Sequence, residues 1–166
     1  AEDLHRRHDL DVAAASLAGE LAERWSTRIQ EGVSTVPGAL EFVRAVASNT
    51  PVALVTGSDP THVDHILEQI GLDAALPSEV RICAGAYQRG KPDPEPFLLA
   101  ARRLGVDIGE CVVFEDSDPG LRAARQAGAT VVFVRHCATA IDALATLAHI
   151  VIDDFTELDP TAWTRP

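Results

Sequence analysis

The sequence has 166 residues, which is enough for one α/β domain with its own hydrophobic core and a small appendage. Hydrophobic residues make up 46% of it and charged residues 23%, as is typical of a globular protein. The formal net charge of −11 repels phosphate backbones and anionic lipid, so we expect neither a nucleic-acid partner nor a membrane partner.

The three cysteines, Cys83, Cys111 and Cys137, lie far apart in the sequence, and no CxxC pair exists. This spacing disfavours a zinc site and favours free thiols in a reducing compartment. The sequence shows neither a signal peptide nor an apolar run long enough to span a membrane. We therefore expect a cytoplasmic protein.

Hydrophobic spacing predicts helices that, beyond residue 50, alternate with short apolar strands. The predicted helices are residues 12–29, 38–48, 60–70, 94–104, 119–127 and 139–148. The predicted strands are residues 51–55, 80–84, 111–114, 130–134 and 150–152. Strands without polar alternation, separated by helices, indicate a parallel sheet with both faces covered. The fold class is therefore α/β and doubly wound, with a ligand site expected at the carboxyl ends of the strands.

Three groups of polar residues fall at or near those strand ends. Thr56, Gly57 and Ser58 follow the strand of residues 51–55 and precede a helix, where hydroxyls and free amides can bind an anion. A helix cap is the alternative for these hydroxyls. Lys91 lies in a loop with Pro92 after it, which restricts the lysine backbone to extended conformations. A fixed ammonium could neutralise a phosphate, although a lone loop lysine is most often solvated surface.

Glu115 and Asp116 end the apolar strand of residues 111–114, and Ser117 follows them. Mg²⁺ binds one or two carboxylates together with water and phosphate oxygens, so this pair is a candidate magnesium site. Asp116 or Ser117 could instead, or also, cap the following helix.

The hydroxyls, the lysine and the acid pair occur in this order along the chain. In this order they resemble the motifs of the haloacid dehalogenase-like (HAD) superfamily. Residues 55–58 resemble its second motif, residues 90–97 its third and residues 112–117 its fourth. The resemblance extends over residues 4–158, is most specific in the last two motifs, and is strongest to the phosphoglucomutase-like and phosphoglycolate phosphatase-like subgroup. It implies a Rossmann-like core in residues 36–166 and part of a small helical cap in residues 1–35.

The family's first motif, a hydrophobic strand followed by Asp-x-Asp, has no match in the sequence. Asp9 and Asp11 have the spacing, but the charged residues before them exclude a buried strand. Asp153 follows an apolar strand, but Phe155 stands where the second aspartate belongs. We therefore expect a central strand, with the attacking aspartate, to lie upstream of Ala1 in a segment of roughly 40–60 residues. Without that strand, two unpaired sheet edges would face each other.

The resemblance implies Mg²⁺-dependent hydrolysis of a small phosphate monoester, such as a sugar phosphate, through an aspartyl phosphate. Thr56, Gly57, Ser58 and Lys91 would bind the phosphoryl group, with Thr56 and Lys91 acting in catalysis, and Glu115 and Asp116 would bind Mg²⁺. A phosphosugar mutase is the alternative within the family. If the 166 residues are the whole protein, a non-catalytic module that binds a phosphorylated metabolite is the alternative outside it. The sequence leaves the oligomeric state open.

Overall fold

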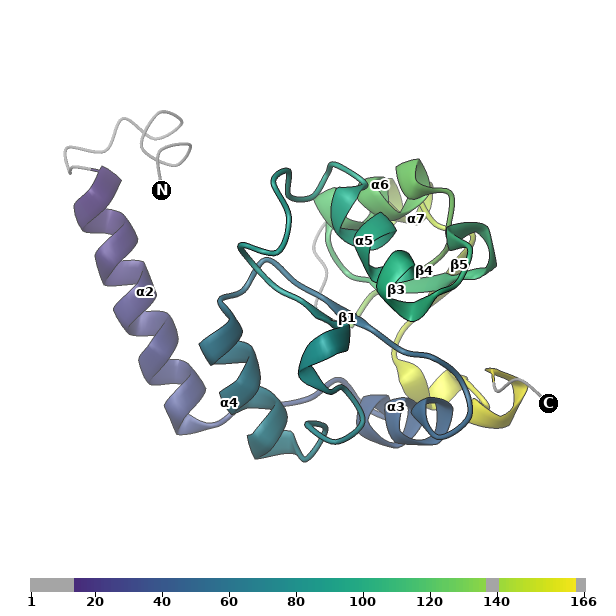
Figure 1. Cartoon of the computed structure of the whole chain (residues 1–166), viewed down its shortest axis with the longest axis horizontal. Helices are drawn as coiled ribbons and strands as arrows, with labels where there is room; N and C mark the ends of the chain where they lie inside the picture. Colours follow the sequence, from purple (N-terminus) through teal and green to yellow (C-terminus); the bar gives the residue numbers. More distant parts are fainter. Residues whose placement is uncertain (1–13, 137–140, 164–166) are drawn as a thin grey trace. The chain divides into compact units, whose positions relative to one another are not determined.

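The computed structural model describes residues 14–136 and 141–163. The chain divides into two compact units, Ala1–Ser34 and Thr35–Pro166. The described part of the first unit is helix α2 (Ala14–Glu31), which matches the helix predicted for residues 12–29 (Figure 1). The rejected Asp-x-Asp candidate at Asp9 and Asp11 lies outside the described residues. Among the residues described, none of the helices is both long and apolar enough to cross a bilayer.

The second unit contains the alternating helices and strands that the sequence predicts. Its helices are α3 (Ala39–Ala47), α4 (Pro60–Ile70), α5 (Glu95–Leu104), α6 (Asp118–Ala127) and α7 (Ile141–Ala145). Its strands are β1 (Leu54–Val55), β2 (Arg81–Ile82), β3 (Val112–Glu115), β4 (Thr130–Val134) and β5 (Ile150–Ile152). Short 3₁₀ helices are η1 (Ser78–Val80), η2 (Ile108–Glu110), η3 (Phe155–Glu157) and η4 (Pro160–Trp163).

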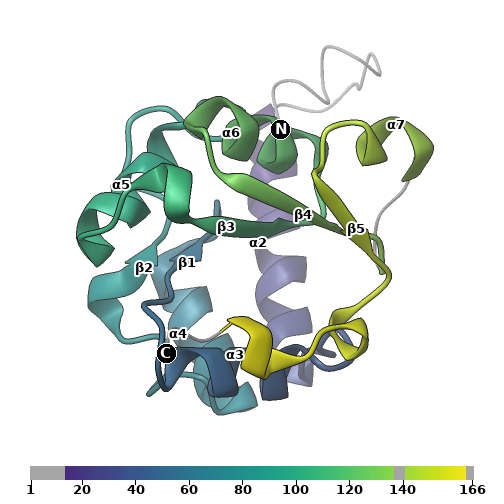
Figure 2. The ribbon, with the colours of Figure 1, turned by 90° about the vertical axis from the view of Figure 1, so that its right-hand side faces the viewer.

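Strand pairing is parallel throughout, as predicted, but the described strands form two sheets. Strand β1 pairs with β2, and a separate sheet has the order β3-β4-β5 (Figure 2). This division agrees with the expectation that two unpaired strand edges face each other, while the upstream central strand itself stays a prediction. The strand predicted for residues 51–55 is shorter in the structure, where β1 has only two residues.

Helices cover both faces of the three-stranded sheet, as a doubly wound fold requires. Alternate residues of β4 point to opposite faces: Val131 and Phe133 pack with α5, α6 and α7. Val132 and Val134 pack on the other face with residues of η3 and η4. These β4 side chains are almost completely buried, so this strand forms the centre of the core.

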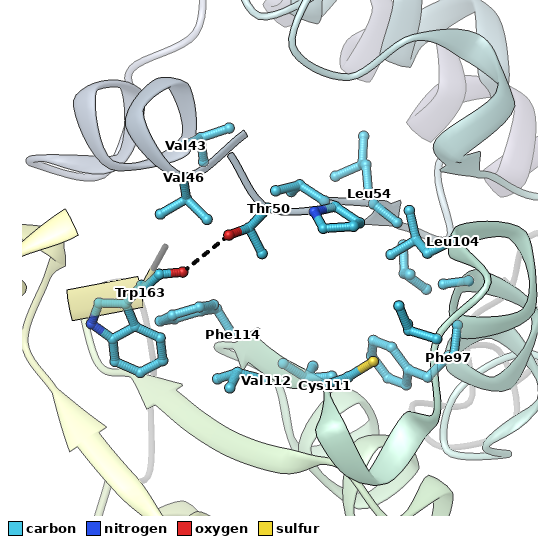
Figure 3. Close-up of a pocket in the computed structure, with 18 of the residues that line it drawn as sticks. Val43, Val46, Thr50, Leu54, Phe97, Leu104, Cys111, Val112, Phe114 and Trp163 are labelled. Atoms are coloured by element: carbon cyan, nitrogen blue, oxygen red, sulfur yellow. Dashed lines mark hydrogen bonds between the residues drawn. The ribbon is translucent and has the colours of Figure 1, made fainter. Parts of the chain in front are cut away.

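A pocket of about 600 Å³ separates the two sheets. One wall is residues 51–55, which include β1, and the opposite wall is residues 110–115, which include β3. Helix α5 contributes Phe97 and Leu104, while α3 and the C-terminal segment contribute side chains such as Val46 and Trp163 (Figure 3). We call this space the interstrand pocket. Its two long walls are the edges of β1 and β3, neither of which has a strand partner on that side within the described residues.

Two of the three cysteines lie in the described part of the chain, and both are thiols outside any disulfide, as predicted. Cys83 is buried, and this burial raises the pKa of its thiol. Cys111 is half-buried and lines the interstrand pocket. Cys137 lies outside the described residues.

Candidate active site

The loop that carries Lys91 is held by the first turn of α5. The carboxylate of Glu95 accepts hydrogen bonds from the backbone amides of Gln88, at 2.9 Å, and Arg89, at 3.1 Å. These hydrogen bonds, that from Gln88 foremost, lower the pKa of Glu95. Asp93 in turn accepts a hydrogen bond from the Glu95 amide at 2.9 Å. The loop before and after Lys91 is thus fixed by local acidic side chains.

Lys91 joins the carboxyl ends of two strands that belong to different sheets. Its Nζ donates a hydrogen bond of 3.1 Å to the carbonyl oxygen of Val55, the last residue of β1. The same Nζ forms an ion pair with Glu115, the last residue of β3, and lies 4.9 Å from the centroid of the Phe97 ring. The side chain of Lys91 is 19% exposed, so this lysine is not a solvated surface residue.

Glu115 is buried at the end of β3 and packs onto the start of α6. Its Oε2 accepts a hydrogen bond of 3.0 Å from Ser117, whose Oγ accepts one of 3.2 Å from the Gly120 amide. Ser117 is therefore the cap of α6, one of the two residues that the sequence allowed for this role. A β-carbon at position 120 would overlap the Glu115 carboxyl group, so only glycine permits this approach. The amide end of the helix also favours a carboxylate here.

Thr56 and Ser58 are not helix caps, because Asp59 caps α4. Asp59 accepts a hydrogen bond from the Thr61 amide at 2.9 Å, and the hydrogen bonds from Thr61, that of its hydroxyl foremost, lower the pKa of Asp59. Thr56 Oγ1 instead accepts a hydrogen bond from the Ser58 amide at 3.1 Å and lies 3.1 Å from Ser58 Oγ. The amide of Gly57, between them, has no hydrogen bond to the described part of the chain.

Asp116 follows Glu115 at the same end of β3 and is exposed. Within residues 14–136 and 141–163, His, Cys, Asp and Glu side chains form no group of three that could hold a metal ion. The two acids of the predicted magnesium pair thus differ in environment: Glu115 is buried against Lys91, whereas Asp116 faces solvent.

The second rejected Asp-x-Asp candidate has a different role in the structure. It follows β5, which is the outer strand of the three-stranded sheet. Asp153 forms an ion pair with Arg135, and Asp154 accepts a hydrogen bond of 2.8 Å from the Thr156 amide and caps η3. Both acids are therefore engaged in local structure.

Tyr87 is a residue of the site that sequence reasoning missed. Its hydroxyl donates a hydrogen bond of 3.1 Å to the carbonyl oxygen of Thr56, across 31 residues of sequence. An aromatic residue in a polar loop close before Lys91 was the only available signal. The site therefore combines the loop after β1, the Lys91 loop and the end of β3.

Comparison with known proteins places these residues in a family. The family described as "haloacid dehalogenase-like hydrolase" has a sequence model that matches residues 2–128. The chain is 33% identical over 135 residues to the fructose-1-phosphate phosphatase YqaB of Escherichia coli, with 81% of this chain and 70% of that protein covered. It spans 57% of the length of two further curated phosphatases.

Solved structures show the same architecture. A HAD family hydrolase from Deinococcus radiodurans, solved with bound phosphate and sodium, is 28% identical, with a TM-score of 0.73 over 98% of this chain and 75% of that chain. A β-phosphoglucomutase from Clostridium difficile has the same fold, with a TM-score of 0.75 at 22% identity over 95% of this chain and 72% of that chain. The resemblance that the sequence motifs indicated is confirmed, and the chain belongs to the haloacid dehalogenase-like hydrolase family.

Proposed function

We propose that this chain is the larger part of an enzyme that hydrolyses a small phosphate monoester, a sugar phosphate or a similar metabolite. One observation carries the proposal. The ammonium of Lys91 is fixed between Val55 and Glu115, and the paired hydroxyls of Thr56 and Ser58 follow Val55 directly in the chain. A cation, hydroxyls and a free amide around one strand end form a site for a tetrahedral anion. The names of the related phosphatase and of the phosphate-bound structure support the same chemistry.

In this proposal each part of the site has a defined task. Thr56 and the amides of Gly57 and Ser58 hold phosphate oxygens, and Lys91 neutralises charge that develops on the transferring phosphoryl group. Glu115 and its hydrogen bond from Ser117 keep the ammonium of Lys91 in place. The contribution of the described residues is therefore positioning and electrostatic stabilisation.

The donor set at the end of β3 fits Mg²⁺, which binds few carboxylates and completes its shell with water and phosphate oxygens. Asp116, exposed at the strand end, would bind the ion directly, and Glu115 would do so directly or through water. The bound ion would neutralise phosphoryl oxygens. With only these two acids at the end of β3, further ligands must come from substrate, water or residues outside the described ranges.

The attacking carboxylate is proposed to enter on a strand that fills the interstrand pocket. The pocket has the shape that such a strand needs: two parallel strand edges as walls, α5 on one side and α3 with the C-terminal segment on the other. Five residues of wall, 51–55, match a strand of roughly 16 Å. The pocket reaches Val55 and Glu115, so a residue just past the end of the inserted strand would lie beside Lys91.

Peptide binding to the purified chain tests the strand. The Trp25→Phe variant leaves Trp163, which lines the pocket, as the only tryptophan to report by fluorescence. A peptide of five β-branched residues followed by aspartate should bind. The same peptide with a central proline should bind at least about tenfold more weakly, because proline donates no ladder hydrogen bond. Equal affinities for the two peptides, or no binding of either, would count against strand insertion.

Turnover of p-nitrophenyl phosphate with Mg²⁺ tests the reaction. The protein with its native upstream sequence should be active, and residues 1–166 alone should be inactive. Thr56→Val and Asp116→Asn should each lower kcat/KM by at least about 100-fold. Thr56→Ser, which keeps a hydroxyl, and Glu68→Gln, an exposed acid on α4, serve as controls. If the longer protein is inert while binding phosphate, a metabolite-binding module replaces the enzyme.

Product analysis with a sugar phosphate as substrate separates a phosphatase from a mutase. A phosphatase transfers the phosphoryl group to water and releases inorganic phosphate from a sugar phosphate. A mutase transfers it to another hydroxyl of the sugar and yields an isomeric phosphate instead. The described residues bind the phosphoryl group in either case, so product analysis decides between the two.

A further inference from the structure

The loop after β1 and the Lys91 loop are connected at three points. The amide of Ala84 donates a hydrogen bond of 3.0 Å to the carbonyl oxygen of Ser58. The hydroxyl of Tyr87 donates one of 3.1 Å to the carbonyl oxygen of Thr56. The ammonium of Lys91 donates one of 3.1 Å to the carbonyl oxygen of Val55. Every one of these bonds runs from residues 84–91 to a carbonyl in residues 55–58.

The three donors differ in kind: Ala84 donates from its backbone amide, Lys91 from a charged ammonium, and Tyr87 from a neutral side-chain hydroxyl. The Tyr87 side chain also packs close to a glycine in each loop. If Gly90 carried a β-carbon, that atom would lie 3.3 Å from Tyr87 Cε2, and a β-carbon on Gly57 would lie 3.9 Å from Tyr87 Oη. A phenol is protonated at neutral pH at its ordinary pKa of about 10, and burial of the ring raises the pKa of Tyr87 further, so its hydroxyl can donate.

Direction matters for what this bond does. When the carbonyl oxygen of Thr56 points to Tyr87, the peptide plane that follows is fixed, and with it the amide of Gly57, because the peptide bond is planar. That amide has no hydrogen bond to the described residues and is therefore available to an anion. The Tyr87 hydroxyl thus fixes a donor that it does not itself contact.

We propose that Tyr87 is a positioning residue that couples the phosphate-binding loop after β1 to the Lys91 loop, so that the Gly57 amide and the Lys91 ammonium address the same anion. The proposal rests on the proposed function, because it assumes that phosphate binds at this site. Glu95 supports the coupling, since its carboxylate holds the two amides that follow Tyr87.

The first arm of the test needs no ligand. Tyr87→Phe keeps the ring and removes only the hydroxyl. Hydrogen exchange of the Ala84 amide, which bonds to Ser58, should become at least about fivefold faster in this variant. Exchange of the Val132 amide, in the buried centre of the sheet, should not change relative to the wild type. An unchanged rate at Ala84 would overturn the proposal whatever the result with phosphate.

The second arm measures binding of inorganic phosphate to the same chain by NMR titration of the Gly57 amide. Tyr87→Phe should weaken binding by about three- to tenfold. In a chain that already carries Lys91→Met, the Tyr87→Phe substitution should weaken phosphate binding by much less, because the two residues then no longer act on the same anion. Equal affinity of wild type and Tyr87→Phe would overturn this inference alone. Absence of phosphate binding by the wild type would overturn both the inference and the anion site of the proposed function.

Discussion

The carboxyl group of Glu115 lies against the Cα of Gly120, in the first turn of α6, with no space for a β-carbon between them. This contact links the end of β3 to the helix that follows it. It also places the carboxylate where Lys91 and Ser117 can reach it from two other directions. Gly120 has no left-handed backbone conformation, so glycine is required here only because the Glu115 carboxyl group packs against it.

Gly120→Ala should therefore destabilise the protein by about 1–3 kcal/mol, as overpacking of a buried site does. Either Glu115 leaves its ion pair or the first turn of α6 moves. Urea unfolding measures the change. Gly19→Ala is the matched control, because Gly19 is also helical but a β-carbon there meets no atom within 4 Å. Alanine favours helix at both positions, so equal effects of the two substitutions would contradict the proposed overlap.

Lys91→Met should destabilise the protein by more than about 2 kcal/mol, because it leaves the Glu115 carboxylate buried without its cation. The double variant Lys91→Met with Glu115→Gln should recover part of that loss, since no buried charge then remains. Thermal or urea unfolding of the four proteins completes a double-mutant cycle. If the two substitutions are additive, the ion pair contributes nothing specific to stability.

Low pH should remove the stabilisation that the Glu95 carboxylate gives to the Lys91 loop. The pKa of Glu95 is lowered in the folded protein by its hydrogen bonds from the Gln88 and Arg89 amides. A lowered pKa contributes stability that is present above the unfolded value of about 4.3 and is lost as the pH falls through the folded value. The wild type should therefore exceed Glu95→Gln in stability at pH 7, and the difference should shrink at lower pH. Urea midpoints over a pH series measure it, and a difference independent of pH would contradict the assignment.

Phe42 is the central ring of an aromatic cluster that lines part of the interstrand pocket. Its ring centroid lies 5.4 Å from that of Phe114, 5.3 Å from Phe155 and 6.1 Å from Trp163, and its side chain is 4% exposed. Phe42→Ala should cost roughly 3–5 kcal/mol in the free energy of unfolding, and Phe42→Leu clearly less. Similar losses for both would mean that volume at this position is unimportant.

Local sequence signals were sufficient for most of the secondary structure. Helix α4 and strands β4 and β5 have the predicted bounds, because proline, glycine and hydrophobic period act within a few residues. Which residues cap the helices was harder to predict from the sequence. Several hydroxyls and acids precede α4 and α6, and only the coordinates decide that Asp59 and Ser117 are the caps.

The order of the polar groups along the chain was enough to predict one site for Thr56, Lys91 and the acid pair of Glu115 and Asp116, since parallel strands share their carboxyl ends. How these groups pair depends on packing. Lys91 reaches Glu115 across 24 residues and Val55 across 36, and no local pattern specifies such contacts. The Tyr87 hydrogen bond to Thr56 was missed for the same reason.

The sequence alone determined most of the helices and strands and the family motifs, because these follow from short-range periodicity and side-chain chemistry. Only the tertiary structure decided which side chains line the pocket between β1 and β3, and that Glu115 is buried while Asp116 is exposed. Such features depend on which edges and faces meet in three dimensions, and residues far apart in the chain decide that together.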